Sequence, residues 1–223
     1  MKIGYIDGPR LRRALIAGCQ WAQQQREELN RINVFPVPDG DTGTNLYLTV
    51  QAIADHLEQS TERSVGGVAH EAAQAAVLGA RGNCGMMLSH FLLGFARSLE
   101  GQRRINASNF GRALEAGVQH LSEALEEPVE GTILTVMRDT ARAVSGAEIE
   151  DIAPLAEHML DRAHDSLERT PELLPVLSAA GVACVIHGGA GKIDRKTLPP
   201  EREKQYHTTL TRSLKAGHAI LKK

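Results

Sequence analysis

The residues best suited to chemistry lie in the segment "NVFPVPDGDTGTN", residues 33–45. Two carboxylates, Asp39 and Asp41, stand two residues apart on a backbone that proline and glycine make irregular, so both can turn toward one point. Hard cations such as Mg²⁺ bind oxygen ligands of this kind and keep water and phosphate oxygens in their remaining positions. Pro-Asp-Gly is also typical of an ordinary turn. Spacing alone therefore leaves a metal site and a solvated turn as open alternatives.

Two further glycine-bearing segments are candidate anion sites. "GARGNCG", residues 79–85, precedes a helical pattern, and "EGTILTVMRDTA", residues 130–141, opens another helix with Gly131 and Thr132. Glycine lets backbone N–H groups approach phosphate oxygens, and the N-terminus of a helix favours an anion. Each segment also has a simpler explanation, a close-packed helix connection for the first and a capped surface helix for the second. Arg81 is either a phosphate clamp or a solvated side chain.

The sequence offers little for acid–base or nucleophilic catalysis. No GxSxG elbow and no HExxH pair occurs. Several histidines fall in helical patterns that favour packed or exposed side chains: His90, His158, His164, His207 and His218. Cys84, beside a glycine loop, is a candidate reactive thiol, but a small packed residue explains it as well.

Length and charge exclude several classes of protein. The chain has 223 residues and a formal net charge of -2, so no basic surplus points to nucleic acid or to an anionic membrane. Its three cysteines include no CxxC pair, which fits a reducing compartment. No stretch reaches the ~18 apolar residues of a membrane span. We expect a cytoplasmic protein that neither binds nucleic acid nor inserts into a membrane.

Helices are expected to position these segments. Apolar residues recur at helical spacing along most of the chain, and this pattern predicts an all-α bundle. A clear example follows the "GARGNCG" segment, with a stripe made of Leu88, Phe91, Leu92, Phe95 and Leu99. Thr170 before Pro171 predicts the start of a further short helix, with proline at its first position.

The pattern changes near Gly181. The segment "VACVIHGGAG", residues 182–191, is apolar and partly β-branched and ends in glycines, which predicts a strand and a turn. Residues 198–223 open with two prolines after a leucine and predict a final helix. We therefore place a domain boundary near Gly181.

Four segments occur in the order and approximate spacing of one known family: "LNRINVFPVPDGDTGTN", "GARGNCGMMLSHFLLGFA", "PVEGTILTVMRDTA" and "TPELLPVLSAAGV". From about Met1 to Gly181 the chain resembles the nucleotide-binding domain shared by the dihydroxyacetone kinase L subunit (DhaL) and the N-terminal part of bacterial fatty acid kinase. It is most similar to the fatty acid kinase branch, including forms with a DegV-like lipid-binding domain in the same chain. The resemblance implies a barrel-like bundle of about eight helices with ATP or ADP and two Mg²⁺ ions at one end.

The resemblance also implies roles for individual residues. Asp39 and Asp41 correspond to the metal-binding, catalytic aspartates, and Asn33 lies in the segment where the L subunit has a third aspartate. The implied nucleotide-binding residues are Thr42, Gly43, Thr44, Asn45, Gly82, Asn83, Cys84, Gly131 and Thr132. The family usually has serine at position 84, and we expect loss of that hydroxyl donor to weaken nucleotide binding.

The tail, residues 182–223, departs from this family, whose members continue with a "VDAGG"-like segment that helps to close the site. It resembles instead the N-terminus of plant-type asparaginase or isoaspartyl peptidase, which opens with a strand, "IHGGAG" and a helix. We do not expect hydrolase activity, because the nucleophilic threonine of that family lies far downstream. The expected organisation is a DhaL-like domain at 1–181, shortened at its end, and an asparaginase-like fragment at 182–223, joined by a real fusion or by a gene-model error.

Three functions remain at this point. The first is an ATP- and Mg²⁺-dependent kinase module whose acceptor is presented by a partner protein or domain, either DegV-like and fatty-acid-binding or dihydroxyacetone-binding. The second is a nucleotide-binding module without turnover, and the third is an incomplete hydrolase fragment. The acceptor and the oligomeric state stay open, with a homodimer as one option.

Overall fold

The computed structural model describes residues 2–179. The two strands are β1 (Ile6–Asp7) and β2 (Arg104–Ile105). The helices of the described residues are α1 (Gly8–Gln24), α2 (Arg26–Arg31), α3 (Thr42–Gln59), α4 (Val65–Gly79), α5 (Gly82–Ser98), α6 (Ala107–Ala124), α7 (Ile133–Ser145), α8 (Ile152–Leu173) and α9 (Pro175–Ala179). The strand, turn and helix that we predicted in the tail lie outside the described residues, as does the boundary near Gly181.

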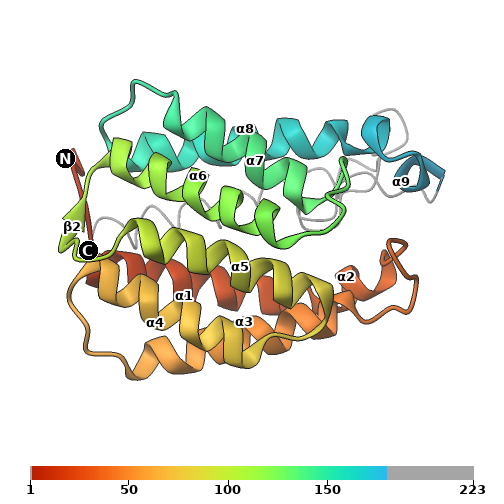
Figure 1. The fold of residues 1–223 in the computed structure, drawn as a ribbon, viewed down its shortest axis with the longest axis horizontal. Helices are drawn as coiled ribbons and strands as arrows, with labels where there is room; N and C mark the ends of the chain where they lie inside the picture. The colour runs from red at the N-terminus through yellow and green to blue at the C-terminus, as the bar shows by residue number, and fades with distance from the viewer. Residues whose placement is uncertain (1, 180–223) are drawn as a thin grey trace, which may run out of the picture.

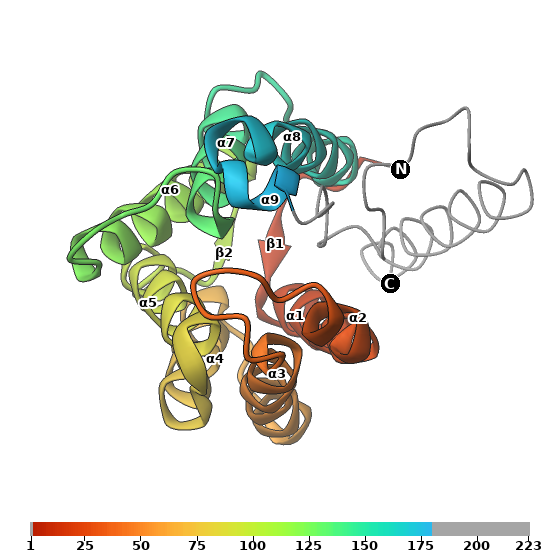
Figure 2. The same cartoon turned by 90° about the vertical axis from the view of Figure 1, so that its right-hand side faces the viewer.

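The long helices run alternately up and down and follow one another around a ring. Contacts join α1 to α3, α3 to α4, α4 to α5, α5 to α6, α6 to α7 and α7 to α8. Figure 2 shows these long helices nearly end-on, arranged one after another around the middle of the molecule. The prediction of an all-α, barrel-like bundle is therefore confirmed.

Alternation gives the bundle two distinct ends, which Figure 1 shows at left and right. Helices α1, α4, α6 and α8 begin at the end that carries the two strands, which we call the strand end. Helices α3, α5 and α7 begin at the opposite end, which we call the loop end. Consequently every connection that leads into α3, α5 or α7 lies at the loop end.

The core is built mainly from aliphatic residues and alanine. Helix α4 is buried along much of its surface by small side chains, namely Val65, Val68, Ala69, Ala72, Ala73, Ala75 and Ala76. Their small size lets α3 and α5 approach α4 closely. Larger side chains such as Ile53, Leu57 and Leu121 fill the space between helices, and burying each stabilises the fold by about 1.5–3 kcal/mol.

A short two-stranded sheet ties the strand end together. Strands β1 and β2 pair antiparallel, with Ile6 opposite Ile105. Both isoleucines are buried. The N–H of Ile152, the first residue of α8, donates to the carbonyl of Ile3 at 2.9 Å. The exposed connection at residues 100–104 leads from α5 into this sheet.

The prediction that a helix starts at Thr170 and Pro171 is wrong. Helix α8 continues through Pro171 to Leu173, and a separate short helix follows from Pro175. Proline has no N–H to donate to the carbonyl of Leu167, four residues earlier. The Thr170 hydroxyl donates to that carbonyl at 2.8 Å, so the acceptor keeps a partner and the helix is not interrupted.

Candidate functional site

The three segments singled out from the sequence lie at the loop end. The segment between α2 and α3 contains the two aspartates, residues 80–81 join α4 to α5, and residues 125–132 join α6 to α7. Figure 2 looks onto this end and shows the first of these connections arching over the ring. The fold therefore brings together segments that are about ninety residues apart in sequence.

The first segment forms an oxygen-rich group around Asn33. The side-chain amide of Asn33 donates to Asp39 Oδ1 at 3.4 Å and to the carbonyl of Val37, while the Thr42 hydroxyl donates to Asn33 Oδ1. Asp39 Oδ1 also accepts the N–H of Asp41 at 3.4 Å. Both carboxylates are exposed. We call Asn33, Asp39, Asp41 and Thr42 the carboxylate loop; it contains all three predicted metal-site residues.

Helix α2 supports the start of α3 through two residues that sequence reasoning missed. Asn30 Oδ1 accepts the N–H of Thr44 at 3.0 Å, and Asn30 Nδ2 donates to the Thr44 hydroxyl at 3.0 Å. Arg26 Nε donates to the same hydroxyl at 3.3 Å. A Cβ at Gly43 would lie 2.1 Å from the carbonyl oxygen of Arg26, so only glycine fits there. Thr44 thus contacts α2, although we had predicted that it binds the nucleotide.

The second segment contacts the start of α3 directly. Gly82 has φ +58°, and a Cβ there would lie 2.6 Å from the side-chain nitrogen of Asn45. The Arg81 N–H donates to the hydroxyl of Thr49 at 3.1 Å. The guanidinium of Arg81 donates to the carbonyl of Ala80 at 2.7 Å and is exposed. The first turns of α3 and α5 therefore lie side by side at the loop end.

Cys84 is a packed thiol in this contact. Its Sγ donates to the carbonyl of Thr42 at 3.5 Å. Burial raises the pKa of the thiol above its ordinary value, and the negative charge of Asp41 raises it further. A reactive thiolate needs a lowered pKa, so the structure favours the packed residue over the reactive thiol.

The third segment packs against α8. Gly131 has φ +79° and is buried, and a Cβ there would lie 2.6 Å from the Cβ of Leu174 and 2.9 Å from the carbonyl oxygen of Thr170. The Thr132 hydroxyl donates to the carbonyl of Val129 at 2.7 Å. The Gly131 N–H also donates to the Thr135 hydroxyl in α7 at 2.9 Å. The predicted nucleotide-facing residues Gly131 and Thr132 are thus at the loop end, but these contacts are within this connection, with the first turn of α7 and with the end of α8.

An ion pair that sequence reasoning missed holds this third segment. Both carboxylate oxygens of Glu130 accept from the guanidinium of Arg138, with Nη2 to Oε2 at 2.7 Å, and the Thr135 hydroxyl donates to Oε2 at 2.7 Å. The bonds from Arg138 and then from Thr135 lower the pKa of Glu130 to about 2. Glu130 is therefore charged at neutral pH, and its bonds hold it, the residue before Gly131, against the first two turns of α7.

The helix starts at the two ends differ in their caps. Four long helices begin at the strand end, and in each a side chain accepts a first-turn N–H: Asp7, Ser64, Asn106 and Asp151. Among the described residues, the three long helices that begin at the loop end follow Asp41, Arg81 and Thr132 and have no such bond from the N-cap side chain. Their first turns also contain no acidic residue. The Thr44 N–H is bound by Asn30 and the Thr135 N–H donates to the carbonyl of Thr132; the remaining first-turn N–H groups are donors that can face an anion.

The atoms at this end that could coordinate a cation are oxygens. Within residues 2–179 no group of three or more His, Cys, Asp or Glu side chains could hold a metal ion. The carboxylate loop instead offers two carboxylates together with an amide oxygen and a hydroxyl. That donor set suits Mg²⁺, which is commonly bound by one or two carboxylates, water and phosphate oxygens.

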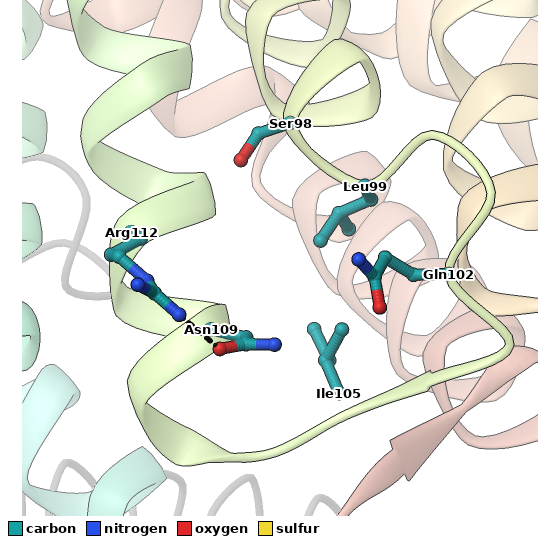
Figure 3. A pocket seen from close by; sticks show the side chains of 6 residues that line it. All are labelled: Ser98, Leu99, Gln102, Ile105, Asn109 and Arg112. Carbon is teal, nitrogen blue, oxygen red and sulfur yellow. Dashed lines mark hydrogen bonds between the residues drawn. The ribbon is translucent and has the colours of Figure 1, made fainter.

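Two cavities lie at the strand end, away from these residues. One, of about 200 Å³, lies between the end of α5 and the start of α6 (Figure 3) and is lined by Ser98, Leu99, Gln102, Ile105, Asn109 and Arg112. The other, of about 400 Å³, lies between the N-terminal segment, the start of α6 and the connection from α7 to α8. No predicted site residue lines either cavity.

The fold is an all-α bundle whose loop end carries three long helix starts without a cap from the N-cap side chain, among the described residues. A family model described as the DAK2 domain matches residues 36–188, and the chain belongs to this family. DAK2 domains are nucleotide-binding modules of the dihydroxyacetone kinase L-subunit type that bind ATP or ADP and work with partner subunits. The match extends past Gly181, and the comparisons give no support to the asparaginase-like interpretation of the tail.

Curated relatives extend the similarity. Protein YloV of Bacillus subtilis is 41% identical over 209 residues, which are 89% of this chain and 38% of YloV. An uncharacterized protein of Staphylococcus saprophyticus is 40% identical over 191 residues, 85% of this chain and 34% of that protein. The chain thus spans less than two fifths of the length of these relatives. None of the helices in the described part of the chain combines the length and apolar character needed to cross a bilayer.

Proposed function

We propose that this chain is an ATP- and Mg²⁺-dependent kinase module that transfers the γ-phosphoryl group to an acceptor presented by a partner protein or domain. The observation that carries the proposal is the set of three helix starts at the loop end that lack the side-chain caps found at the strand end. First-turn N–H groups and helix dipoles that converge on one region favour a polyphosphate. Membership of the DAK2 family supports a nucleotide as its source.

Asp39 and Asp41 would hold the metal, with Asn33 as the third member of the site. The hydrogen bonds from Asn33 to Asp39 and from Thr42 to Asn33 already keep these oxygens together. We propose two Mg²⁺ ions there, by resemblance to the family. Bound Mg²⁺ would neutralise charge on the phosphates. The chain itself then contributes position and electrostatics rather than covalent chemistry.

The phosphates would lie between the first turns of α3 and α5. We assign direct contacts to the backbone N–H groups of Thr42 and Gly43 on one side and of Gly82, Asn83 and Cys84 on the other. Two other predicted ligands have neighbours that suggest a supporting role. Thr44 is bound by Asn30 and Arg26, while Gly131 packs on Leu174. Asn45 lies against Gly82 and would set how closely α5 packs against α3. Thr132 would lie at the edge of the phosphate site.

The acceptor would come from outside this helical domain. The curated relatives are more than twice as long as the aligned segment. We propose a DegV-like fatty-acid-binding domain or a dihydroxyacetone-binding subunit as the acceptor carrier. A second candidate function, nucleotide binding without turnover, is favoured by one observation, the thiol of Cys84 where the family usually has a serine hydroxyl.

The test is calorimetric titration of MgATP into the purified 223-residue chain and into Asp39→Asn and Asp41→Asn. We expect micromolar-range binding by the parent chain, loss of Mg²⁺-dependent binding in both variants, and unchanged helix content by circular dichroism. Asp161→Asn, an exposed aspartate in the middle of α8, is the matched control and should bind like the parent.

Unchanged affinity in both loop variants would refute the metal assignment. A transfer assay with labelled γ-phosphate then separates the two candidate functions, using a fatty-acid-loaded DegV-like domain and a dihydroxyacetone-loaded subunit as acceptors. Binding with no transfer to either acceptor would favour the module without turnover.

A further inference from the structure

Thr49 is a buried polar residue whose hydroxyl joins α3 to the start of α5 at the loop end. It lies in α3, is fully buried, and donates to the carbonyl of Asn45 at 2.8 Å within its own helix. The same oxygen accepts the N–H of Arg81, the residue that precedes α5, at 3.1 Å. The buried hydroxyls of Ser89 and Thr170 bond to carbonyls of their own helices, and that of Ser166 joins α8 to Asp139 of α7, away from the first turns of α3 and α5.

The glycines of "GNCG" fit around this link. A Cβ at Gly85 would lie 2.5 Å from the Thr49 hydroxyl oxygen, and a Cβ at Gly82 would lie 2.6 Å from the side chain of Asn45. Asn45 and Thr49 are one turn apart on α3, and Gly82 and Gly85 are about one turn apart on α5. The side chains of Asn45 and Thr49 on α3 therefore lie against Gly82 and Gly85 on α5, and the Thr49 hydroxyl also accepts the Arg81 N–H.

The Arg81 N–H is the donor that determines where α5 begins. As the N-cap residue, Arg81 is followed at once by Gly82, Asn83 and Cys84, whose amides open the helix. This bond is partly buried, so an Arg81 amide left beside an apolar side chain at position 49 would lose its acceptor at a cost that favours rearrangement of the turn. The hydroxyl thus holds the first turn of α5 at a fixed distance from the first turn of α3.

We infer that Thr49 is a positioning residue for nucleotide phosphates: through the Arg81 amide it sets the relative placement of the α3 and α5 N-termini. The inference rests on the proposed function, because the phosphates are what the two first turns would share. Thr49 itself is buried beneath the turn and does not contact the ligand. Its effect on binding is therefore transmitted through the backbone of α5.

The test compares Thr49→Val, which keeps the shape and removes the hydroxyl, with Thr49→Ser, which keeps the hydroxyl. Calorimetry with MgATP should show about tenfold or greater weakening for Thr49→Val and an affinity close to the parent for Thr49→Ser. Magnesium tripolyphosphate should lose affinity by the same factor, because the change affects the phosphate donors. Ser89→Ala, which removes a buried hydroxyl bonded within α5, should keep parental affinity.

These titrations distinguish a failure of the proposed function from a failure of the inference about Thr49. A parent chain that binds no MgATP refutes the proposed function and removes the basis of this inference. A parent chain that binds, with Thr49→Val binding equally well, refutes the inference alone. Should Thr49→Val fail to fold, hydrogen exchange of the parent without nucleotide decides: a protected Arg81 amide supports the link, and an amide that exchanges like an exposed turn overturns it.

Discussion

Among the described residues, four helices at the strand end start from aspartate, serine or asparagine N-cap side chains that accept a first-turn N–H. At the loop end, the N-cap residues of three long helices make no such bond, and only α3 has a first-turn N–H bound by another side chain, that of Asn30. A side-chain cap stabilises a helix by about 1 kcal/mol. The loop end therefore forgoes about 2 kcal/mol, at α5 and α7, that the same residue types could supply. Stability of this size is commonly sacrificed where a site must bind a ligand. The difference is the one that the proposed function requires: caps stabilise the strand end, while the loop end would keep N–H donors for a phosphate-bearing ligand.

The largest effect should come from Gly82→Ala. A methyl group there meets the Asn45 side chain, and φ +58° disfavours any L side chain. We expect at least tenfold weaker MgATP binding together with about 1–2 kcal/mol lower stability. Gly101→Ala is the control at the strand end: it has φ +72°, but among described atoms nothing lies within 4 Å of the added Cβ. Chemical denaturation should show the loss of stability due to positive φ in both variants, and calorimetry should show weaker MgATP binding in Gly82→Ala alone.

A cap introduced at the loop end should oppose binding. In Arg81→Asp, a carboxylate can accept first-turn N–H groups of α5 and places a negative charge beside the phosphates. We expect stability to rise by about 0.5–1 kcal/mol while affinity for MgATP falls several-fold. Arg81→Gln, which removes the charge and adds no cap, is the matched control. An Arg81→Asp variant that binds MgATP as tightly as Arg81→Gln would contradict the role of these donors.

Removal of a cap at the strand end should lower stability without changing MgATP affinity. Ser64 Oγ accepts the Gly67 N–H at 3.0 Å at the start of α4. Ser64→Ala should lower the free energy of unfolding by about 1 kcal/mol and leave MgATP affinity unchanged. Denaturant titration and calorimetry on the same preparation check both parts. A parallel loss of affinity would show that the two ends are not independent.

The smallest effect should be a pH dependence at the third segment. The folded pKa of Glu130, about 2, lies below its ordinary value of 4.5. Its ion pair with Arg138 therefore stabilises the fold above about pH 4.5, and this contribution is lost as pH falls toward 2. Melting temperatures of the parent and of Glu130→Gln should differ at pH 7 and converge near pH 2. Because Glu130 is half-exposed, high salt should reduce the difference at pH 7. A constant difference across this range would contradict the assignment.

Much of this arrangement could be predicted from local sequence. Apolar periodicity reports which face of a helix is buried, so it predicted the all-α bundle. The Pro, Gly and Asp content of residues 33–45 marked an irregular, oxygen-rich loop. The fold then brought Asn33 to Asp39 and placed all three glycine-bearing segments at one end.

Contacts between helices could not be predicted in this way. Thr49 occupies a buried helical position where a threonine has no distinctive spacing, and its role depends on which helix packs against it. Asn30 and Arg26 act through Thr44, fourteen or more residues away in sequence. The continuation of α8 through Pro171 depends on a hydroxyl bond that replaces the missing backbone bond, and propensity alone predicts a break there.

The exposed connection at residues 100–104 has a practical consequence. It leaves α5 at the strand end and lies beside the capped start of α6, a whole helix length from the first turns of α3 and α5. An epitope inserted or a fluorophore attached at Gly101 would lie away from the loop end, where the proposed phosphate donors lie. The same position would also allow the chain to be tethered to a surface, so that nucleotide exchange could be followed on single immobilised molecules with the loop end facing free solution.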